Sequence, residues 1–491
     1  MREPFAFLPN ASSLPWADVP CWPAEDFVAA TAEELGRGAR LCSLFSMPER
    51  SGACLVAVLA FDSDNTLAVG RSMAFSGAFP SLTPSHPQAH LFEREIWEER
   101  SIAPAGHPWL KPVRAGSEGA PVNGEFFRVD GSEIHEVAVG PVHAGIIEPG
   151  HFRFQCAGEE VLHLEIALGY QHRGIESALV GGPHRTTLAQ MEAVSGDATA
   201  AHATAYASVM ESLAGAEPPL RAQWLRAIAL ELERLASHTG DIGALAGDVA
   251  FLPTTSACGK IRGDFLNLTA MVCGNRFSRG LVLPGGCWHD LEPARADRLR
   301  ASLQSALSDA ERAVAWFWDS ASVRARFEGT GTVFPGQAVE IGMVGPAARA
   351  CGLVRDVRYD HPAGWFRFAQ LPVAVWPSGD VFARARVRSL EIQRSGEFLL
   401  AQLDSPADGP LREDLPGLAS ASLAVTLVEG WRGEICHVAI TDSAGRFRRY
   451  KITDPSFHNW TGLALALRGT AISDFPICNK SFNLSYCGFD L

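Results

Sequence analysis

Hydrophobic and polar residues alternate regularly through the first part of the chain. The apolar run Cys54–Phe61 is followed by a polar turn and a second run, Thr66–Phe75, which predicts two neighbouring strands. In Ala89–Glu99, apolar residues recur every three or four positions among glutamates and arginines, and this spacing predicts an amphipathic helix. We interpret its acidic stretch, Glu93–Glu99, as a face exposed to solvent or to a partner. These elements predict a small α/β domain over residues 1–113.

The pattern changes twice in the middle of the chain. Residues 114–124, rich in Gly and small polar residues, predict a linker. Residues 126–168 carry the alternation of apolar and polar positions that is typical of half-buried strands. From residue 172 to 330 the apolar residues return to helical spacing. The helices expected there are His184–Leu213, Pro219–Leu245, Gly259–Val272 and Pro293–Phe327.

Beyond residue 330 the elements are mixed. Asp380–Glu397 has helical spacing, and Ile435–Ile440 and Arg446–Ile452 form a hairpin across a turn rich in Asp, Ser and Gly. A bundle of four long helices can hold a cofactor between facing side chains. We therefore predict an α+β fold with three parts: the α/β domain 1–113, the linker 114–124, and a helical bundle with flanking β subdomains over 125–491.

Charge and hydrophobicity narrow the functional classes. The formal net charge is −13, which argues against a nucleic-acid partner, because non-specific binding to phosphates needs a basic surface. No stretch of 18 apolar residues predicts a membrane-spanning helix, and residues 1–10 lack the pattern of a secretory signal. We therefore expect a cytoplasmic protein, or one attached to a membrane through its partners.

The cysteines point away from a metal site. The chain has 11 of them, an odd number, and no two form a C-x-x-C pair. Structural zinc and iron–sulfur sites normally need such pairs, because two ligands must reach one ion from a single turn. We expect free thiols in a reducing compartment.

Several short motifs are too specific to be generic packing. In the first 113 residues they are Phe79–Thr83 (FPSLT), His90–Glu95 (HLFERE) and Gly106–Pro108 (GHP). In the remainder they are Gly140–His143 (GPVH), His172–Glu176 (HRGIE), Glu231–Phe251 and Gly342–Pro362.

On these motifs the chain resembles the large subunit of membrane-bound, energy-converting (group 4) nickel–iron hydrogenases. It also resembles the homologous quinone-site subunit of respiratory complex I. Residues 1–113 resemble the small complex I subunit that is fused ahead of the large subunit in those hydrogenases. The resemblance covers nearly the whole chain and implies a hydrogenase-large-subunit-like fold for residues 125–491.

The chain departs from this family at the metal ligands. The hydrogenases hold nickel and iron with four thiolates from two C-x-x-C pairs, and the resemblance aligns those ligands with Ser195, Ala198, Ser485 and Gly488. Nearby Cys487 does not replace them. Soft thiolates bind nickel, whereas a Ser hydroxyl is a hard, poor ligand and Ala and Gly offer no side-chain donor. We therefore expect no metal and no cofactor in this chain, and no hydrogen turnover.

Two further groups of residues have roles implied by the resemblance. Arg173, Glu176, Asp197 and His202 are expected around the lost metal site, where Glu176 matches a proton-relay carboxylate; alternatively, Glu176 forms a structural Arg–Glu pair. A complex I-like quinone site would use His143 or His151 on the Gly140–His151 loop. The tyrosine that accompanies such a histidine in complex I falls near Ser195 or Gly196, where no Tyr stands.

The function expected from the sequence is that of a hydrogenase-like subunit without a nickel–iron centre. It would belong to a complex I-related, ion-translocating complex, in a coupling or scaffold role, peripheral on the cytoplasmic side of the inner membrane. The expected partners are a small iron–sulfur subunit that holds a four-iron cluster, and antiporter-like and complex I-like membrane subunits. The alternatives are an oxidoreductase that reduces quinone or another acceptor at the emptied site, and a purely structural subunit. An active hydrogenase remains only if the alignment of the ligand positions is wrong.

Overall fold

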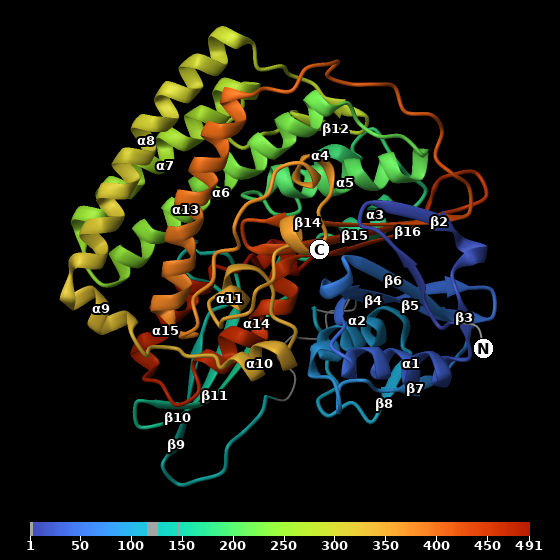
Figure 1. Cartoon of the computed structure of the whole chain (residues 1–491). Helices are drawn as coiled ribbons and strands as arrows, with labels where there is room; N and C mark the ends of the chain where they lie inside the picture. The colour runs from blue at the N-terminus through green and yellow to red at the C-terminus, as the bar shows by residue number, and fades with distance from the viewer. Residues whose placement is uncertain (1–2, 115–125, 146) are drawn as a thin grey trace.

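The structure is a computed structural model that describes residues 3–114, 126–145 and 147–491. A four-stranded antiparallel sheet of order β16-β15-β14-β2 lies at its centre (Figure 1). Three of these strands come from the end of the chain and β2 from its beginning, so the two ends of the sequence share one sheet. The strands are β2 (Ser12–Pro15), β14 (Ser422–Gly430), β15 (Gly433–Thr441) and β16 (Phe447–Thr453).

The N-terminal region forms a second, five-stranded sheet with helices beside it (Figure 1). The predicted strand pair is confirmed, since β5 and β6 run antiparallel with Ala60 opposite Leu67. The predicted helix is confirmed as α2. The elements are β1 (Ala6–Leu8), β3 (Cys21–Trp22), α1 (Ala24–Gly36), β4 (Arg40–Glu49), β5 (Gly52–Phe61), β6 (Thr66–Ser72), β7 (Ala78–Pro80), α2 (His90–Arg100) and β8 (Ala103–Ala105).

The central sheet is covered on both faces. On one face, Val425 and Val438 join the buried residues of β4, β5 and β6, including Val56. On the other face, Ala424 and Tyr450 pack with residues of α5 (Thr199–Ala214). Alternate residues of β14 therefore serve two cores, which explains why all nine of its residues are buried.

The acidic stretch of α2 is not a solvated face. Glu93 is fully buried, and its carboxylate accepts hydrogen bonds from the backbone N–H of Leu82 (2.6 Å) and from the hydroxyl of Thr83 (2.6 Å). Glu95 is 2% exposed and pairs with Lys451 at 2.7 Å. The sequence suggested exposure because the cation that compensates Glu95 lies about 350 residues away along the chain. The stretch is instead an internal interface with the central sheet.

Long helices form a layer beside the central sheet, seen along the upper left of Figure 1. Four of the predicted helical segments are confirmed, although α7 begins seven residues earlier than expected and Pro293–Phe327 divides at Ser320. The helices are α6 (Leu220–Asp248), α7 (Leu252–Cys273), α8 (Pro293–Asp319), α9 (Ala321–Phe327) and α13 (Val381–Asp404).

The predicted helix His184–Leu213 is wrong as one element. The structure has α4 (Thr187–Met191), a non-helical stretch, and then α5. The carbonyl groups of this stretch bond to other parts of the chain: Arg173 donates to the oxygen of Val194 at 2.9 Å, and Trp431 Nε1 to the oxygen of Asp197 at 2.8 Å. Tertiary donors thus replace the helical N–H groups that would otherwise bond to these carbonyls.

The remaining elements complete an α+β fold, which confirms the predicted fold class. A three-stranded sheet of order β11-β10-β9 projects at the bottom of Figure 1. Further elements are β9 (Ile134–Val139), β10 (His151–Ala157), β11 (Glu160–Ala167), α3 (Ile175–Leu179), β12 (Val282–Leu283), β13 (Gly286–Cys287), α10 (Pro335–Glu340), α11 (Gly345–Arg349), α12 (Val357–Asp360), α14 (Pro455–Ala466), α15 (Phe475–Phe482) and α16 (Tyr486–Phe489).

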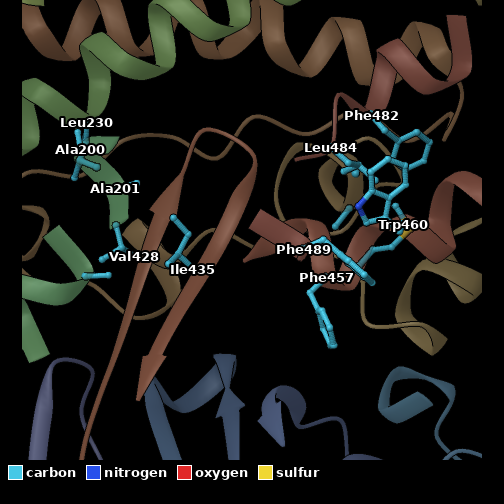
Figure 2. Packing of buried hydrophobic residues seen from close by; sticks show 14 of the residues in the cluster. Ala200, Ala201, Leu230, Val428, Ile435, Phe457, Trp460, Phe482, Leu484 and Phe489 are labelled. Carbon is cyan, nitrogen blue, oxygen red and sulfur yellow. The ribbon is translucent and has the colours of Figure 1, made fainter. Parts of the chain in front are cut away.

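The C-terminal helices close the interior. Figure 2 shows Phe457, Trp460 and Phe489 gathered with Phe482 and Leu484, apart from the group around Val428 on β14. The stacked rings of Phe457 and Phe489 are 5.2 Å apart, which fixes α16 against α14. The last residues of the chain are thereby held in the core.

The predicted domain division remains a prediction. Except for Arg114, the predicted linker 114–124 lies outside the described residues. Arg114 is buried and donates to the carbonyl oxygen of Phe489 at 3.3 Å. Within residues 3–114, 126–145 and 147–491, no helix combines the length and the apolar character needed to cross a membrane.

Candidate functional site

Two segments far apart in the sequence meet beside the central sheet. Ser195, in the break between α4 and α5, and Ser485, just before α16, place their Oγ atoms 3.1 Å apart. Ser485 Oγ also accepts the backbone N–H of Gly488 at 2.9 Å, and so caps the short last helix. We call the four positions Ser195, Ala198, Ser485 and Gly488 the serine site. They are the positions that the resemblance aligns with metal ligands.

Arg173 joins the two segments. Its guanidinium donates to the carbonyl oxygens of Ala193 (2.7 Å), Val194 (2.9 Å) and Cys487 (3.0 Å). The structure therefore brings Arg173 to the serine site as predicted, with its guanidinium bonded to backbone carbonyls. These contacts hold the break before α5 against the C-terminal segment.

Asp454 fills the space next to Gly488. A Cβ atom at position 488 would lie 2.7 Å from the carboxylate of Asp454, closer than side chains approach one another. That carboxylate is itself fixed, since it accepts the backbone N–H of Ser456 at 2.8 Å at the start of α14 and lies 3.1 Å from His202 Nε2. A cysteine at position 488 would therefore collide with a carboxylate that has little freedom to move.

His202 begins a chain of buried hydrogen bonds. Its Nδ1 lies 3.1 Å from Nε2 of His437, and Nδ1 of His437 lies 2.9 Å from the hydroxyl of Tyr450. Burial raises the pKa of Asp454, but His202, Arg432 and Ser456 together outweigh it, so this pKa stays below its usual value. The ionised carboxylate only accepts, so Nε2 of His202 donates to it. Burial and the neighbouring His202 keep the pKa of His437 well below its usual value, so its ring is neutral.

Asp197 binds the turn of the β14–β15 hairpin. Its two carboxylate oxygens accept from the guanidinium of Arg432 at 2.6 and 2.7 Å. Ser195 Oγ donates to the same carboxylate at 3.1 Å. Burial raises the pKa of Asp197, but Arg432 outweighs it and the pKa lies below its usual value. Asp197 therefore lies at the serine site, and His202 reaches it through Asp454. The roles of both residues stay predictions.

Glu176 lies in a different set of contacts. Its carboxylate accepts from Lys451 Nζ and from the backbone N–H of Ile452, both at 3.0 Å, and lies 3.3 Å from Arg449. Lys451 also binds Glu95 of α2. Among the described residues the partners of Glu176 lie on β16, and Lys451 links it onward to α2. This arrangement fits the structural alternative, an ion-paired carboxylate.

The two loop histidines bind their own loop. His143 Nε2 lies 2.9 Å from the carbonyl oxygen of Gly150, and His151 Nδ1 lies 3.2 Å from that of Gly140. A Cβ at Gly150 would touch the ring of Tyr486 at 2.6 Å, so the loop lies against the C-terminal segment of the serine site. The quinone role of His143 and His151 stays a prediction.

Sequence reasoning missed three residues of the site: Asp454, Arg432 and His437. Asp454 had a detectable signal, because Asp followed by Pro455 is a typical helix start. His437 lies in a strand of the predicted hairpin, whereas Arg432 lies in the β14–β15 turn, which the sequence did not predict. The importance of both depends on contacts with α5 and the break before it. Such contacts leave no local pattern in a sequence.

The side-chain groups gathered here are hydroxyls, carboxylates, imidazoles and one thiol, that of Cys487, whose Sγ lies 3.4 Å from Ser485 Oγ. In the parts of the chain that the structure describes, no three His, Cys, Asp or Glu side chains are arranged to hold a metal ion. The cavity beside Asp197, between α6 and α7, has a volume of about 20 Å³, which is close to the space for one water molecule. Ser195, Ser485, His202 and Asp454 are buried, whereas the side chain of Asp197 is 42% exposed and Arg173 lies at the surface.

Several known proteins are similar to this chain. Residues 248–422 match the family described as respiratory-chain NADH dehydrogenase, 49 Kd subunit. Formate hydrogenlyase subunit 5 of Escherichia coli is 30% identical over 434 residues, covering 83% of this chain and 76% of the relative. NADH-quinone oxidoreductase subunit 4 of Thermus thermophilus is 27% identical, with 70% and 90% covered. A chain from the membrane-bound sulfane sulfur reductase, an archaeal respiratory membrane complex, has the same fold, with a TM-score of 0.67, 23% identity, and 74% and 100% covered.

Proposed function

Because the chain belongs to the family of hydrogenase large subunits and complex I 49 kDa-type subunits, we propose that it is a subunit of a membrane-bound redox complex in which the family's nickel–iron site is no longer formed. Its role there is to couple redox or conformational change to ion movement, or to act as a scaffold for that coupling.

The contact between Gly488 and Asp454 carries this proposal. Loss of a thiolate alone would leave a gap, but here the carboxylate of Asp454 stands within 2.7 Å of where a side chain at position 488 would begin. His202 and the start of α14 hold that carboxylate in place. A four-thiolate centre therefore fits neither the chemistry of these donors nor the space between them.

Ser195 and Ser485, two further positions of the aligned ligand set, also lack the features of a metal site. The hydroxyls of Ser195 and Ser485 bond to each other at 3.1 Å, and Arg432 lies 3.4 Å from Ser195 Oγ. A cation so close to the hydroxyl disfavours a second cation such as a nickel ion. The serine site is satisfied by its own hydrogen bonds.

The proposed setting follows from the family. One relative is a chain of a respiratory membrane complex, and the described residues of this chain contain no helix that could span a membrane. We place this subunit at the periphery of such a complex, on the cytoplasmic side of the inner membrane. A small iron–sulfur subunit with a four-iron cluster and antiporter-like membrane subunits are its proposed partners.

Metal analysis of the purified protein tests the loss of the centre. The chain is produced in a host that matures nickel–iron hydrogenases, beside an active relative as a positive control, and nickel and iron are quantified by mass spectrometry. We expect stoichiometric metal in the relative and only background in this chain. About one nickel per chain would overturn the proposal.

The coupling role has a separate test in the assembled complex. Glu176→Gln keeps the shape of the side chain and removes its charge next to Lys451. A coupling role predicts an assembled complex with reduced ion transport. Unchanged ion transport would remove the support for a relay at Glu176 and leave the scaffold role.

A further inference from the structure

A second group of charges lies buried where α6, α11, α12, α13 and β14 meet. Four carboxylates and three guanidiniums are in mutual contact, and each of these residues is at most 7% exposed. When every carboxylate is ionised, the group carries one uncompensated negative charge. We call this group the ionic cluster: Glu231, Arg234, Arg349, Asp356, Arg358, Glu391 and Glu429.

The three guanidiniums of the ionic cluster are shared unequally among its four carboxylates. Glu391 accepts from Arg349 at 2.5 Å, from Arg234 at 3.1 Å and from His238 at 2.7 Å. Burial raises the pKa of Glu391, but the two guanidiniums outweigh it and hold this pKa well below its usual value. Glu391 is therefore ionised.

Glu231 and Asp356 are also well compensated. Arg358 donates to both carboxylates, at 2.9 Å to Glu231 Oε1 and at 2.6 Å to Asp356 Oδ2. Ser395 adds a hydrogen bond to Glu231 at 2.6 Å. The pKa values of both carboxyls lie below their usual values, because the guanidiniums outweigh burial.

Among the four carboxylates of the cluster, that of Glu429 is the least compensated by hydrogen bonds and positive charge. Its carboxylate accepts one guanidinium N–H, from Arg349 at 2.8 Å, and one backbone N–H, from Val357 at 3.1 Å. Arg234 bonds to the carbonyl oxygen of Glu429 at 2.8 Å. Burial and the nearby charge of Asp356 raise the pKa of Glu429 to about 7. The uncompensated charge of the cluster therefore falls on this carboxyl group.

Glu429 also borders a cavity. A cavity of about 530 Å³ lies between α5, α6, β14 and the loop around residues 362–367, with Glu429 and Arg358 in its wall. Glu217 and Arg367, whose side chains are 76% and 41% exposed, line it too, so it opens to solvent. The hydroxyl of Thr426, which also lines the cavity, is buried without a hydrogen-bond partner. Solvent thus reaches the wall of the ionic cluster.

Other charges lie near Glu429 on β15, α5 and the elements of the ionic cluster, whereas β2, which also pairs with β14, carries none. The residue opposite it on β15 is Glu434, whose carboxylate is bound by Arg40 at 2.8 Å. On α5, Glu211 is paired with Arg226 at 2.6 Å. Because each of these carboxylates is paired with its own arginine, neither pair supplies a spare positive charge to Glu429. The charged and titratable groups around it are Arg234, His238, Arg349, Asp356, Arg358, Asp360, Glu391, Glu434, Arg40, Glu211 and Arg226.

We propose that Glu429 is a proton-binding site, which takes up one proton from solvent through this cavity and returns it there. With the proton bound, the ionic cluster is neutral; without it, the cluster carries one negative charge. This site goes beyond the proposed loss of the metal centre and does not depend on it. The two regions are joined by the β14–β15 turn, where Trp431 packs on His238 with ring centroids 6.0 Å apart and Arg432 binds Asp197.

Infrared difference spectroscopy of the full chain tests the proposal. Between about pH 5.5 and about pH 8.5, the wild type is expected to lose the carbonyl stretch of a protonated, buried carboxylic acid, with a midpoint near neutrality. Glu429→Gln should lack this component. A wild-type difference spectrum that persists unchanged in Glu429→Gln would overturn the proposal.

A matched control guards against a second buried acid. Burial raises the pKa of Glu233 to about 8, so it contributes its own carbonyl component. Glu233→Gln should remove that component and leave the one assigned to Glu429. If Glu233→Gln removes the whole signal, Glu429 does not bind the proton.

Thermal unfolding gives an independent readout. A carboxyl group whose pKa is raised by folding costs stability as pH rises through this range. Glu429→Gln should therefore gain in melting temperature relative to wild type between about pH 5.5 and about pH 8.5. A constant difference between the two proteins across this range would also overturn the proposal.

Discussion

The serine site, at which Asp197 is partly exposed, and the ionic cluster, which is fully buried, balance their charges in different ways. At the serine site, each ionised group has a fitted partner: Asp197 is held by Arg432, and Asp454 by His202. In the ionic cluster, four carboxylates share three guanidiniums, and Glu429 has the weakest compensation. The first region is closed by its own contacts, whereas the second retains a group that can exchange a proton.

The contrast indicates where proton exchange can occur among buried polar groups. A lost ligand set is stabilised by filling its space and pairing its charges, as Asp454 does beside Gly488. A cluster with one excess charge cannot be balanced by packing alone, so a proton must supply the balance. We therefore propose proton exchange at the ionic cluster and no metal centre at the serine site.

The largest expected effect comes from removing one cation of the ionic cluster. Arg349→Met keeps much of the side-chain volume but leaves Glu391 and Glu429 without a shared guanidinium. We expect a loss of about 3–5 kcal/mol in the free energy of unfolding, measured by chemical denaturation. The control Arg367→Met breaks an exposed pair with Glu217 and should cost about 1 kcal/mol or less. Equal effects of the two substitutions would contradict the picture of a buried, tightly shared charge.

The next effect tests whether the serine site is full. Gly488→Ala places a methyl group against the fixed carboxylate of Asp454 and should cost about 1–3 kcal/mol by overpacking. Gly259→Ala on α7 is the control, because nothing lies within 4 Å of its added methyl group, and it should be neutral or stabilising.

A double-variant cycle identifies the cause of that cost. If the clash with Asp454 is responsible, Gly488→Ala should cost less in an Asp454→Ala background than in the wild type. Additive effects would show that the space beside Gly488 is not limited by Asp454.

A smaller effect is expected from the hydroxyl of Ser195. Ser195→Ala removes hydrogen bonds to Ser485 and to Asp197 and should cost about 1–2 kcal/mol. Ser46→Ala is the control, since the buried Oγ of Ser46 has no hydrogen-bond partner and its removal should be neutral or stabilising. A serine site that tolerates Ser195→Ala as well as Ser46→Ala would not be held by these bonds.

The smallest effect is on how the free energy of unfolding changes with pH. Asp197 and Glu429 are expected to change this slope with opposite signs. The pKa of Asp197 is lowered by folding, so its stabilisation is present above the usual range of the group and is lost in acid. The pKa of Glu429 is raised, so its unfavourable contribution grows as pH rises toward neutrality. Asp197→Asn should flatten the acid limb of the stability profile and Glu429→Gln the limb near neutrality. The same change of slope in both variants would refute the contrast.

Local patterns in the sequence predicted much of the fold and part of the site. The β15–β16 hairpin and the long helices follow from spacing alone, because each buries one face of a regular element. The break before α5 was missed because its carbonyl groups are bonded by Arg173 and Trp431, which are distant in sequence. Arg173, Asp197 and His202 lie near Ser195 and Ser485, and their roles stay predictions.

The rest of the site depends on contacts that no single segment encodes. The role of Asp454 appears only when the missing Cβ of Gly488 is seen beside it. The burial of Glu95 requires Lys451, and Glu176 shares that same cation. The ionic cluster gathers charges from five separate elements, each of which reads as an ordinary polar position on its own.

The most direct test of the central claim is anomalous X-ray scattering from crystals of the protein, recorded at the nickel and iron absorption edges. The account predicts no anomalous peak within bonding distance of the hydroxyls of Ser195 and Ser485, which should remain in contact with each other. A pair of peaks between Ser195 and Gly488 would contradict it.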